Sequence, residues 1–291
     1  MNYFSQRELG PPPRISEEIT PPVWQAVVAA VDRRVQDGSF GNAFPERCGD
    51  FGYTVGTHSE MMGRSLLGAV PSVTWPLELD AIPHNFGALD LIEFCYARVA
   101  QPRREAFHDY FRHYRLSFNV DAGRAEFRDE INGIFAAHGI AFELNEAGQI
   151  VRLAPPEVQD ILNSAQFDTG DADLDRLLNT ARVRFLRPRE EDRRDGLEKL
   201  VDAWERIKTL EEPNDKRRSV TRILDRCAGN PTLRDLLENQ ARAFTDAGNA
   251  FMIRHHEMNK VPLENSEQVD FLFEALFALV YFVLRSTGRA A

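Results

Sequence analysis

The sequence has 291 residues, which is long enough for two domains, because chains of this size often divide. Hydrophobic residues make up 43% of the chain and charged residues 27%, and this balance excludes disorder along its whole length. The formal net charge of −10 argues against a protein that coats nucleic acid with a basic surface, but it permits a site that holds one phosphate with a few arginines.

The first half of the chain is predicted to mix helices with a short hairpin. Prolines at 11–13 predict an extended arm, and the segment 20–22 is typical of a helix start, with apolar spacing that continues to Gly38. Residues 39–80 are rich in glycine and proline and yield no assigned element. Further helices are expected at 88–99, 107–116 and 124–137. Two short strands at 140–144 and 149–153 predict a β-hairpin.

The second half is predicted to be entirely helical. Helical periodicity covers five segments with short connections, at 171–185, 190–210, 216–228, 231–256 and 268–285. The change of pattern places a domain boundary near 154–168. The first 159 residues carry a net charge of −7 and the remainder −3, which indicates the second half as the place for an anionic ligand.

The strongest candidate for a working site is Arg254-His255-His256, near the predicted end of a helix. Histidine transfers protons near neutral pH, and arginine stabilises a phosphate on which charge builds up. Together these groups suit cleavage of a phosphodiester without a metal ion. The alternative is structural, because cations near a helix carboxyl end are favoured by its dipole and adjacent residues do not share a helix face.

Two other segments are candidates to support this site. Asp202 and Arg206 are four residues apart and suit a surface pair, while Asp202 or Glu205 would orient an arginine or histidine across the bundle. The alternative is a solvated helix face. Gly248 and Asn249 interrupt a helical stretch, and glycine there suggests close approach of a neighbouring helix or of a second copy of the chain, or else a simple kink.

Nothing in the sequence predicts a metal site or a cofactor. The three cysteines, Cys48, Cys95 and Cys227, are widely spaced, which favours a reducing, cytoplasmic setting without disulfides. His108 and His113 are five residues apart on an expected helix, which is not the usual same-face pair, so a structural or interface role is favoured. Familiar nucleotide-binding, zinc-protease and nucleophile-elbow motifs do not occur.

No membrane association is predicted. The first residues lack an apolar stretch of signal-peptide length. The most apolar run, 271–284, is shorter than the roughly 20 residues that a membrane-spanning helix needs, so it is expected to be a buried core helix.

The order of several segments resembles AbiJ-type abortive-infection proteins. Residues 248–257, followed by Lys260 and the apolar helix from Val269, resemble the HEPN domain of that family, as do residues 197–208 and 215–216 upstream. The N-terminal half is similar to one of the variable AbiJ N-terminal domains, through the segments 4–7, 44–48, 91–95 and 148–152.

The resemblance implies a mainly α protein with two domains. An N-terminal sensor or regulatory domain over 1–158 would be mostly helical with a small β-hairpin, and an HEPN-like helical bundle would cover 165–289. Such bundles commonly form homodimers, and many are metal-independent endoribonucleases in phage defence. Arg254 and His255 match the start of the family signature, but the expected later histidine is absent, because Asn259, Lys260 and Val261 occupy its window.

Two functions are therefore compatible with the sequence. In the first, the chain is a defence ribonuclease in which Arg254 stabilises the phosphate, His255 or His256 moves the proton, and Asp202, Glu205 or Asn249 supports them. In the second, the C-terminal bundle is a non-catalytic binding or dimerisation module that acts through a partner or a nucleotide.

Overall fold

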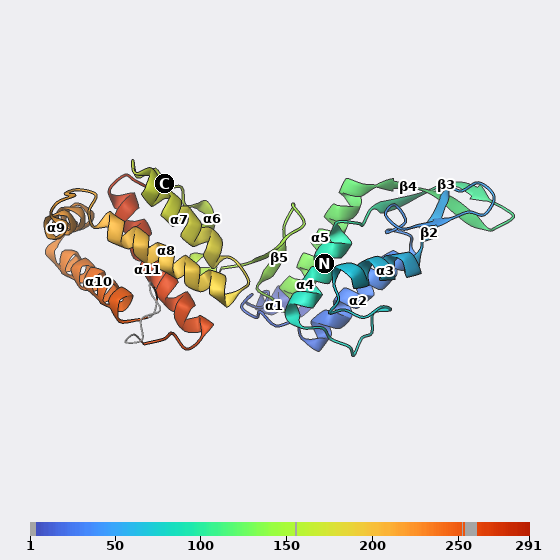
Figure 1. Ribbon diagram of the computed structural model, residues 1–291, viewed down its shortest axis with the longest axis horizontal. Helices are drawn as coiled ribbons and strands as arrows, with labels where there is room; N and C mark the ends of the chain where they lie inside the picture. The colour runs from blue at the N-terminus through green and yellow to red at the C-terminus, as the bar shows by residue number, and fades with distance from the viewer. Residues whose placement is uncertain (1–3, 155, 252, 254–260) are drawn as a thin grey trace. The chain divides into compact units, whose positions relative to one another are not determined.

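The computed structural model describes residues 4–154, 156–251, 253 and 261–291. The chain divides into two compact units, Met1–Leu153 and Ala154–Ala291 (Figure 1). Each unit contains its own hydrophobic core. Helices predominate in both. Among the described residues, the strands pair only as two-stranded antiparallel sheets, so the predicted mainly α fold with small hairpins is confirmed.

The N-terminal unit combines helices with three small hairpins. The residues 39–80, which had no predicted element, form the first hairpin and a short helix. The elements are α1 (Phe4–Leu9), α2 (Pro21–Gln36), β1 (Pro45–Arg47), β2 (Thr54–Thr57), α3 (Ser59–Ala69), α4 (Asn85–Tyr96), β3 (Gln101–His108), β4 (His113–Asn119), α5 (Val120–Ala137), β5 (Phe142–Leu144) and β6 (Ile150–Arg152). The predicted helices at 88–99 and 124–137 and the predicted hairpin at 140–153 are confirmed as α4, α5 and β5–β6.

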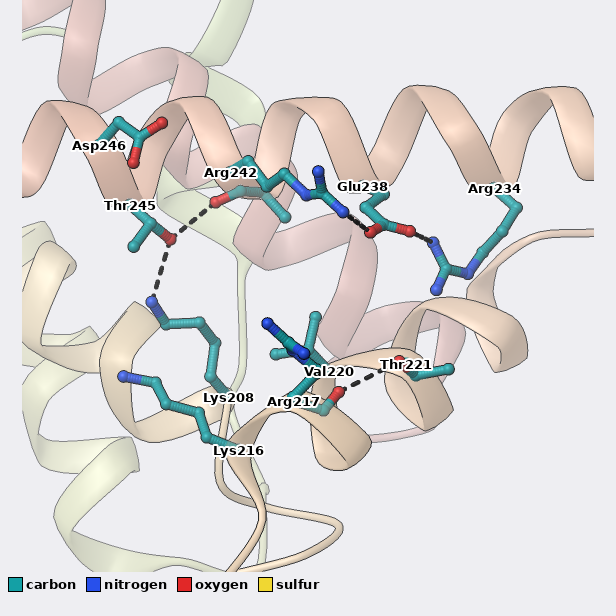
Figure 2. Close-up of a pocket in the computed structure, with 11 residues that line it drawn as sticks. Lys208, Lys216, Arg217, Val220, Thr221, Arg234, Glu238, Arg242, Thr245 and Asp246 are labelled. Atoms are coloured by element: carbon teal, nitrogen blue, oxygen red, sulfur yellow. Dashed lines mark hydrogen bonds and ion pairs between the residues drawn. The ribbon is translucent and has the colours of Figure 1, made fainter.

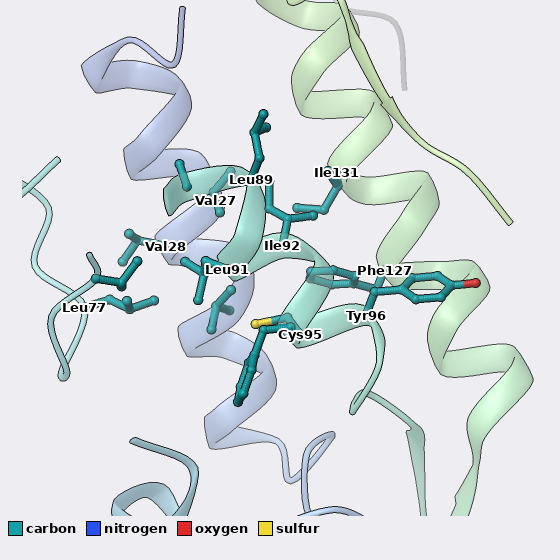
Figure 3. Close-up of a cluster of buried hydrophobic side chains, with 14 of the residues drawn as sticks. Val27, Val28, Leu77, Leu89, Leu91, Ile92, Cys95, Tyr96, Phe127 and Ile131 are labelled. Atoms are coloured by element: carbon teal, nitrogen blue, oxygen red, sulfur yellow. The ribbon is translucent and has the colours of Figure 1, made fainter. Parts of the chain in front are cut away.

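Helix α4 lies at the centre of the N-terminal core, between α2 and α5 (Figure 3). Its side chains Leu91, Ile92 and Cys95 are fully buried, and apolar residues cover most of its surface. A helix that is apolar nearly all round is expected to be enclosed by other elements. Val28 of α2 and Phe127 of α5 pack on its two sides and belong to the same cluster.

The predicted helix at 107–116 is wrong, because this segment forms the end of the β3–β4 hairpin. His108 pairs directly with His113 across the hairpin, and residues 109–112 form the connection. Arg112 has a φ of 53°, which an α-helix does not permit. Aromatic residues such as Phe107 and Tyr114, which face each other here with ring centroids 4.8 Å apart, also favour strands over helices.

The C-terminal unit is a bundle of helices. Its elements are α6 (Pro156–Ser164), α7 (Ala172–Phe185), α8 (Glu190–Ile207), α9 (Lys216–Cys227), α10 (Pro231–Ala250) and α11 (Ser266–Ser286). Helix α8 packs on both α7 and α11, so it lies inside the bundle. The predicted segments 171–185, 190–210, 216–228 and 268–285 agree with α7, α8, α9 and α11 to within a few residues.

Stacked aromatic rings hold the middle of this bundle together. Phe185 of α7 lies parallel to Phe273 of α11 with 3.8 Å between ring centroids, and Phe277 continues the stack one turn later. Trp204 of α8 is buried in the same cluster. Such rings bury large apolar areas, which accounts for the position of α11 in the core. Across the part of the chain that the structure describes, no helix is both long and apolar enough to cross a membrane.

Helix α10 ends at Ala250, earlier than the predicted limit at residue 256. Phe251 has extended backbone angles and pairs with Val261 in an isolated bridge, so it cannot continue the helix. Gly248, on the last turn of α10, is buried, and a Cβ there would lie 3.0 Å from a methyl group of Val201 on α8. The glycine therefore serves the close approach of a neighbouring helix, one of the roles expected from the sequence.

Two glycines on α5 give a matched test of the N-terminal packing. A Cβ at Gly123 would lie 2.3–2.5 Å from backbone atoms of Ala100 and Gln101, whereas Gly133 on the same helix is exposed with nothing within 4 Å. We expect Gly123→Ala to lower the free energy of unfolding by about 1–3 kcal/mol, because the backbone must shift. Gly133→Ala should raise it by up to about 1 kcal/mol, through helix propensity alone. Urea unfolding measures both, and a loss of stability in the two variants alike would contradict this packing.

Candidate functional site

The residues predicted to form the catalytic site lie mostly outside the described part of the chain. Arg254, His255 and His256 are not among the residues that the structure describes. Asn249 is exposed on the last turn of α10. Asp202 and Glu205 lie on α8 and are half-buried, so the three supporting residues are the part of the predicted site that the structure describes.

Asp202 lies near Lys199, one turn earlier on α8, with 3.8 Å between the ammonium nitrogen and a carboxylate oxygen. Arg206, considered as its partner from the sequence, donates instead to carboxylates at the start of α7. Its Nε lies 2.7 Å from Asp171, and its Nη2 lies 3.3 Å from Asp173. Asp171 also caps α7 by accepting hydrogen bonds from two backbone amides, so Arg206 fixes α8 against the beginning of α7.

The carboxylate of Glu205, on the last turn of α8, contacts two lysines. Lys208, the residue that follows α8, donates to one carboxylate oxygen of Glu205, and Lys216, the first residue of α9, donates to the other. The side chain of Lys208 is only 6% exposed, and it also donates to the Thr245 hydroxyl on α10 at 3.0 Å. This cluster therefore links α8, α9 and α10.

Burial and charge pairing act in opposite directions on the pKa values of this cluster. Burial lowers the pKa of Lys208, and the hydrogen bond with Glu205 opposes the shift only in part. Burial alone would raise the pKa of Glu205, but the hydrogen bonds from Lys208 and Lys216 together lower it below its ordinary value. Glu205 therefore stays ionised near neutral pH and compensates a lysine that has little contact with water.

This cluster forms one end of a pocket of about 860 Å³ between the end of α8 and the helices α9 and α10 (Figure 2). Five of the lining side chains are cationic and two are acidic. The lining residues are Lys208, Lys216, Arg217, Val220, Thr221, Arg234, Glu238, Ala241, Arg242, Thr245 and Asp246. The pocket wall thus carries a formal charge of +3 in a chain whose net charge is −10.

Acidic residues hold two of the cations in place along α10. Glu238 accepts hydrogen bonds from Arg234 at 2.7 Å and from Arg242, and Asp225 of α9 accepts a second bond from Arg234 at 2.6 Å. These hydrogen bonds lower the pKa of Glu238. They also fix the two guanidinium groups on the face of α10 that lines the pocket.

Arg217 is the cation of this pocket that is available for a ligand. It is exposed on the first turn of α9, and none of the described carboxylates lies within ion-pair distance of its guanidinium group. Figure 2 shows it extending from α9 into the space below α10, beside the ammonium groups of Lys208 and Lys216. A cationic pocket with an uncompensated guanidinium suits a phosphate, because arginine binds two phosphate oxygens at once.

The sequence contains a signal for this pocket that the prediction did not use. On α10, the charged residues 234, 238, 242 and 246 follow one another at intervals of four, so they form a single charged stripe on one helix face. On α9, the run 216–218 places three cations at the helix start. Both patterns are visible in the sequence, but their alignment across a pocket depends on how the helices pack.

The Glu205 cluster should control the stability of the C-terminal unit in a pH-dependent manner. Glu205→Gln leaves buried Lys208 without its carboxylate partner. We therefore expect the free energy of unfolding at pH 7 to fall by about 1–2 kcal/mol, which allows for solvent screening of the partly exposed Glu205. The folded-state pKa of Glu205 is below the ordinary 4.5, so its stabilisation is complete above that pH and is lost as the pH falls through the folded-state pKa.

The difference between wild type and Glu205→Gln should therefore be constant above about pH 5 and shrink at lower pH. Urea unfolding across this range measures it. Glu198→Gln is the matched control, because Glu198 lies on the same helix but pairs with Lys199, whose side chain is 36% exposed. An equal loss of stability in both variants would contradict the role given to the buried lysine.

Comparison with known proteins identifies the N-terminal part of the chain. A family model described as AbiJ N-terminal domain 4 matches residues 2–168, which is more than half of the sequence. Comparisons with curated proteins and with solved structures found no match. The match agrees with the resemblance seen in the N-terminal segments. The chain therefore belongs to the AbiJ N-terminal domain 4 family and is an AbiJ-type protein, of the abortive-infection kind.

Proposed function

We propose that this protein defends against phage by binding RNA in the basic pocket of its C-terminal unit and cleaving it without a metal ion. The observation that carries the proposal is the pocket between α8, α9 and α10, where five cations meet and Arg217 has no carboxylate partner among the described residues. RNA presents a row of phosphates, and such a pocket attracts them even though the chain as a whole is acidic.

The catalytic groups of the proposal follow α10 in the sequence. Arg254 stands four positions after the last residue of that helix, and its guanidinium would stabilise the pentacoordinate phosphate. His255 or His256 would take the proton from the ribose 2′-OH or give one to the leaving oxygen. Asn249 and Asp202 remain supporting residues, whereas Glu205 sets the charge of the pocket by compensating Lys208 and Lys216.

The two units have separate roles in this proposal. Residues 165–289 form the HEPN-like bundle that binds and cleaves RNA. Residues 1–158 form the regulatory domain, which senses the trigger of infection. The family match supports the second assignment, because it covers residues 2–168 with an AbiJ N-terminal domain.

A non-catalytic assembly role is the second candidate, and it rests on an apolar groove at the start of α11. Phe271 is 68% exposed and Val261 is 59% exposed, and they line a groove of about 630 Å³ with Phe251 and Leu272. Exposed apolar surface of this kind is typical of protein contacts. In this function, two copies of the chain would associate as a homodimer through the C-terminal bundle.

RNA binding should depend on Arg217 rather than on charge in general. With a short 2′-O-methyl RNA, which resists cleavage, we expect Arg217→Ala to weaken binding about fivefold at about 0.1 M salt, as the loss of one phosphate contact predicts. Arg218→Ala is the matched control, because Arg218 is the next residue on α9 but does not line the pocket. Glu205→Gln should strengthen binding, since it releases two lysines. Equal effects of the Arg217 and Arg218 variants in a fluorescence anisotropy titration would contradict the pocket.

Cleavage should require Arg254 and proceed in EDTA. We expect the wild type to cut total RNA under the inducing trigger and Arg254→Ala to lose at least about 100-fold of the rate, because a guanidinium that stabilises developing charge typically contributes this much. Arg218→Ala serves again as the control. If wild type and Arg254→Ala cleave equally, the catalytic assignment is wrong. If neither cleaves while both bind RNA with dependence on Arg217, the protein is a binding module.

A further inference from the structure

A second cluster of chemically reactive side chains lies in the N-terminal unit, far along the sequence from the basic pocket. Cys48, His108 and His113 each offer one potential ligand atom, and these atoms lie within 4.8 Å of one another. Cys48 follows β1, and the two histidines face each other at the tip of the β3–β4 hairpin. The five-residue spacing that separates two histidines on a helix thus brings them together on a hairpin.

The imidazole groups have buried nitrogen atoms without hydrogen-bond partners. Nδ1 of His108 and Nε2 of His113 are both inaccessible to solvent, and no described group donates to them or accepts from them. A buried polar atom that lacks a partner costs roughly 1–3 kcal/mol, so such atoms call for an explanation. A neutral imidazole nitrogen with a free lone pair is the commonest ligand of a transition-metal ion in proteins.

The carboxylate of Asp50 is placed to orient one of these rings. Its Oδ2 lies 3.9 Å from Nε2 of His108, on the other side of the ring from the orphan Nδ1. A histidine that binds a metal usually directs its second nitrogen to a carboxylate, which fixes the tautomer that leaves the other nitrogen unprotonated. At 3.9 Å this contact is longer than a hydrogen bond, so in the present geometry Asp50 acts on the ring through its charge, which favours a proton on Nε2 over one on Nδ1.

The backbone around the cluster also fixes the three ligands. The amide of Cys48 donates to the carbonyl of Tyr53 at 2.9 Å, and its carbonyl accepts from the amide of Gly52 at 3.0 Å, so the thiol stands on a closed turn. At the hairpin tip, Arg112 adopts a φ of 53°, which costs energy for a residue other than glycine. This strained position immediately precedes His113 and allows the ring to face His108.

Aromatic rings cover the cluster. Phe111 stacks on both imidazoles, with centroid distances of 5.3 Å to His108 and 5.7 Å to His113. Tyr53 and Phe51 contact the same site edge-on, and Cys48 itself is only 4% exposed. A surrounding of low polarity strengthens the bonds of a thiolate and two imidazoles to a cation, because water competes poorly there.

We propose that this cluster is a zinc site in which Sγ of Cys48, Nδ1 of His108 and Nε2 of His113 bind one Zn²⁺. One thiolate and two neutral imidazoles are a ligand set that zinc accepts, and a fourth position stays open for water. Ligand atoms on a tetrahedral zinc lie roughly 3.3–3.6 Å apart, so binding would draw the present atoms, up to 4.8 Å apart, about 1 Å closer. It would also turn the two imidazoles, which now stack with 5.5 Å between centroids, so that both lone pairs face the ion. The ion would tie the β1–β2 connection to the tip of the β3–β4 hairpin.

Metal binding by the full-length, tag-free chain tests the proposal. After removal of metals with EDTA, Co²⁺ serves as a spectroscopic substitute for zinc, and competition with Zn²⁺ gives the affinity. We expect a thiolate-to-cobalt charge-transfer band in the wild type, its loss in Cys48→Ser, and at least about tenfold weaker zinc binding in His113→Gln. Asp50→Asn should weaken binding about tenfold while the thiolate band persists, because Asp50 acts through His108.

Two control variants separate this site from general metal binding. Cys227→Ser removes a thiol from the core of the other unit, and His138→Gln removes an exposed imidazole, so both should bind zinc as the wild type does. The absence of a thiolate-to-cobalt band in the wild type would overturn the proposal, and this result does not depend on whether the variants fold. Persistence of the band in folded Cys48→Ser, or equal zinc affinity in folded His113→Gln and wild type, would overturn it as well.

Discussion

The candidate RNA site depends on one interaction, the pairing of the Glu205 carboxylate with two lysines. This carboxylate accepts hydrogen bonds from Lys208 at the end of α8 and from Lys216 at the start of α9, while Lys208 also donates to Thr245 of α10. Lysine is seldom buried as deeply as Lys208 unless a carboxylate compensates it. One acid thus sets the positions of three helices and, at the same time, limits how strongly the pocket attracts an anion.

This arrangement explains how an acidic protein can present a basic site. Acids on the helices beside the pocket, such as Glu238 and Asp225, hold the arginines of α10 in fixed orientations rather than removing their charge from the surface. Arg217 is left without such a partner among the described carboxylates. Local charge, fixed by packing, therefore governs how strongly this pocket attracts an anion, and the net charge of −10 says little about it.

The candidate site of the N-terminal unit is also built from residues that are distant in the sequence, but its side chains favour a different kind of ligand. Cys48, His108 and His113 come from two separate hairpins: strand pairing joins the two histidines, and contact between β2 and β4 brings the hairpin of Cys48 to them. A thiolate with two imidazoles favours a transition metal, whereas the lysines and arginines of the C-terminal pocket favour phosphate oxygens. An ion at the hairpin tip would make this end of the AbiJ-type domain rigid without enlarging its core.

The sequence predicted those parts of the fold that depend on local patterns. Helices such as α4 and α5 follow from apolar spacing, and the β5–β6 hairpin follows from two short strands around a turn. The segment 107–116 was predicted as a helix because its aromatic residues suit either structure, and cross-strand pairing decided between them. The strands at 45–47 and 54–57 are too short to show any periodicity.

Both candidate sites depend on contacts between elements that are distant in the sequence. Lys208 and Thr245 are 37 residues apart, yet they share a hydrogen bond, and no local rule predicts it. The charged stripe on α10 and the cationic run 216–218 on α9 were both visible in the sequence, but their alignment across one pocket was not. Glu205 was predicted to orient an arginine or a histidine, and among the described residues its partners are two lysines.

Cross-linking of RNA to the full-length chain, followed by mass spectrometry of the linked peptides, tests the central claim most directly. The account predicts that a photoreactive single-stranded RNA links to the peptides of α9 and α10 that contain Arg217 and Arg242, and that excess unlabelled RNA removes these links. Links confined to the N-terminal unit, or no links that unlabelled RNA displaces, would contradict it.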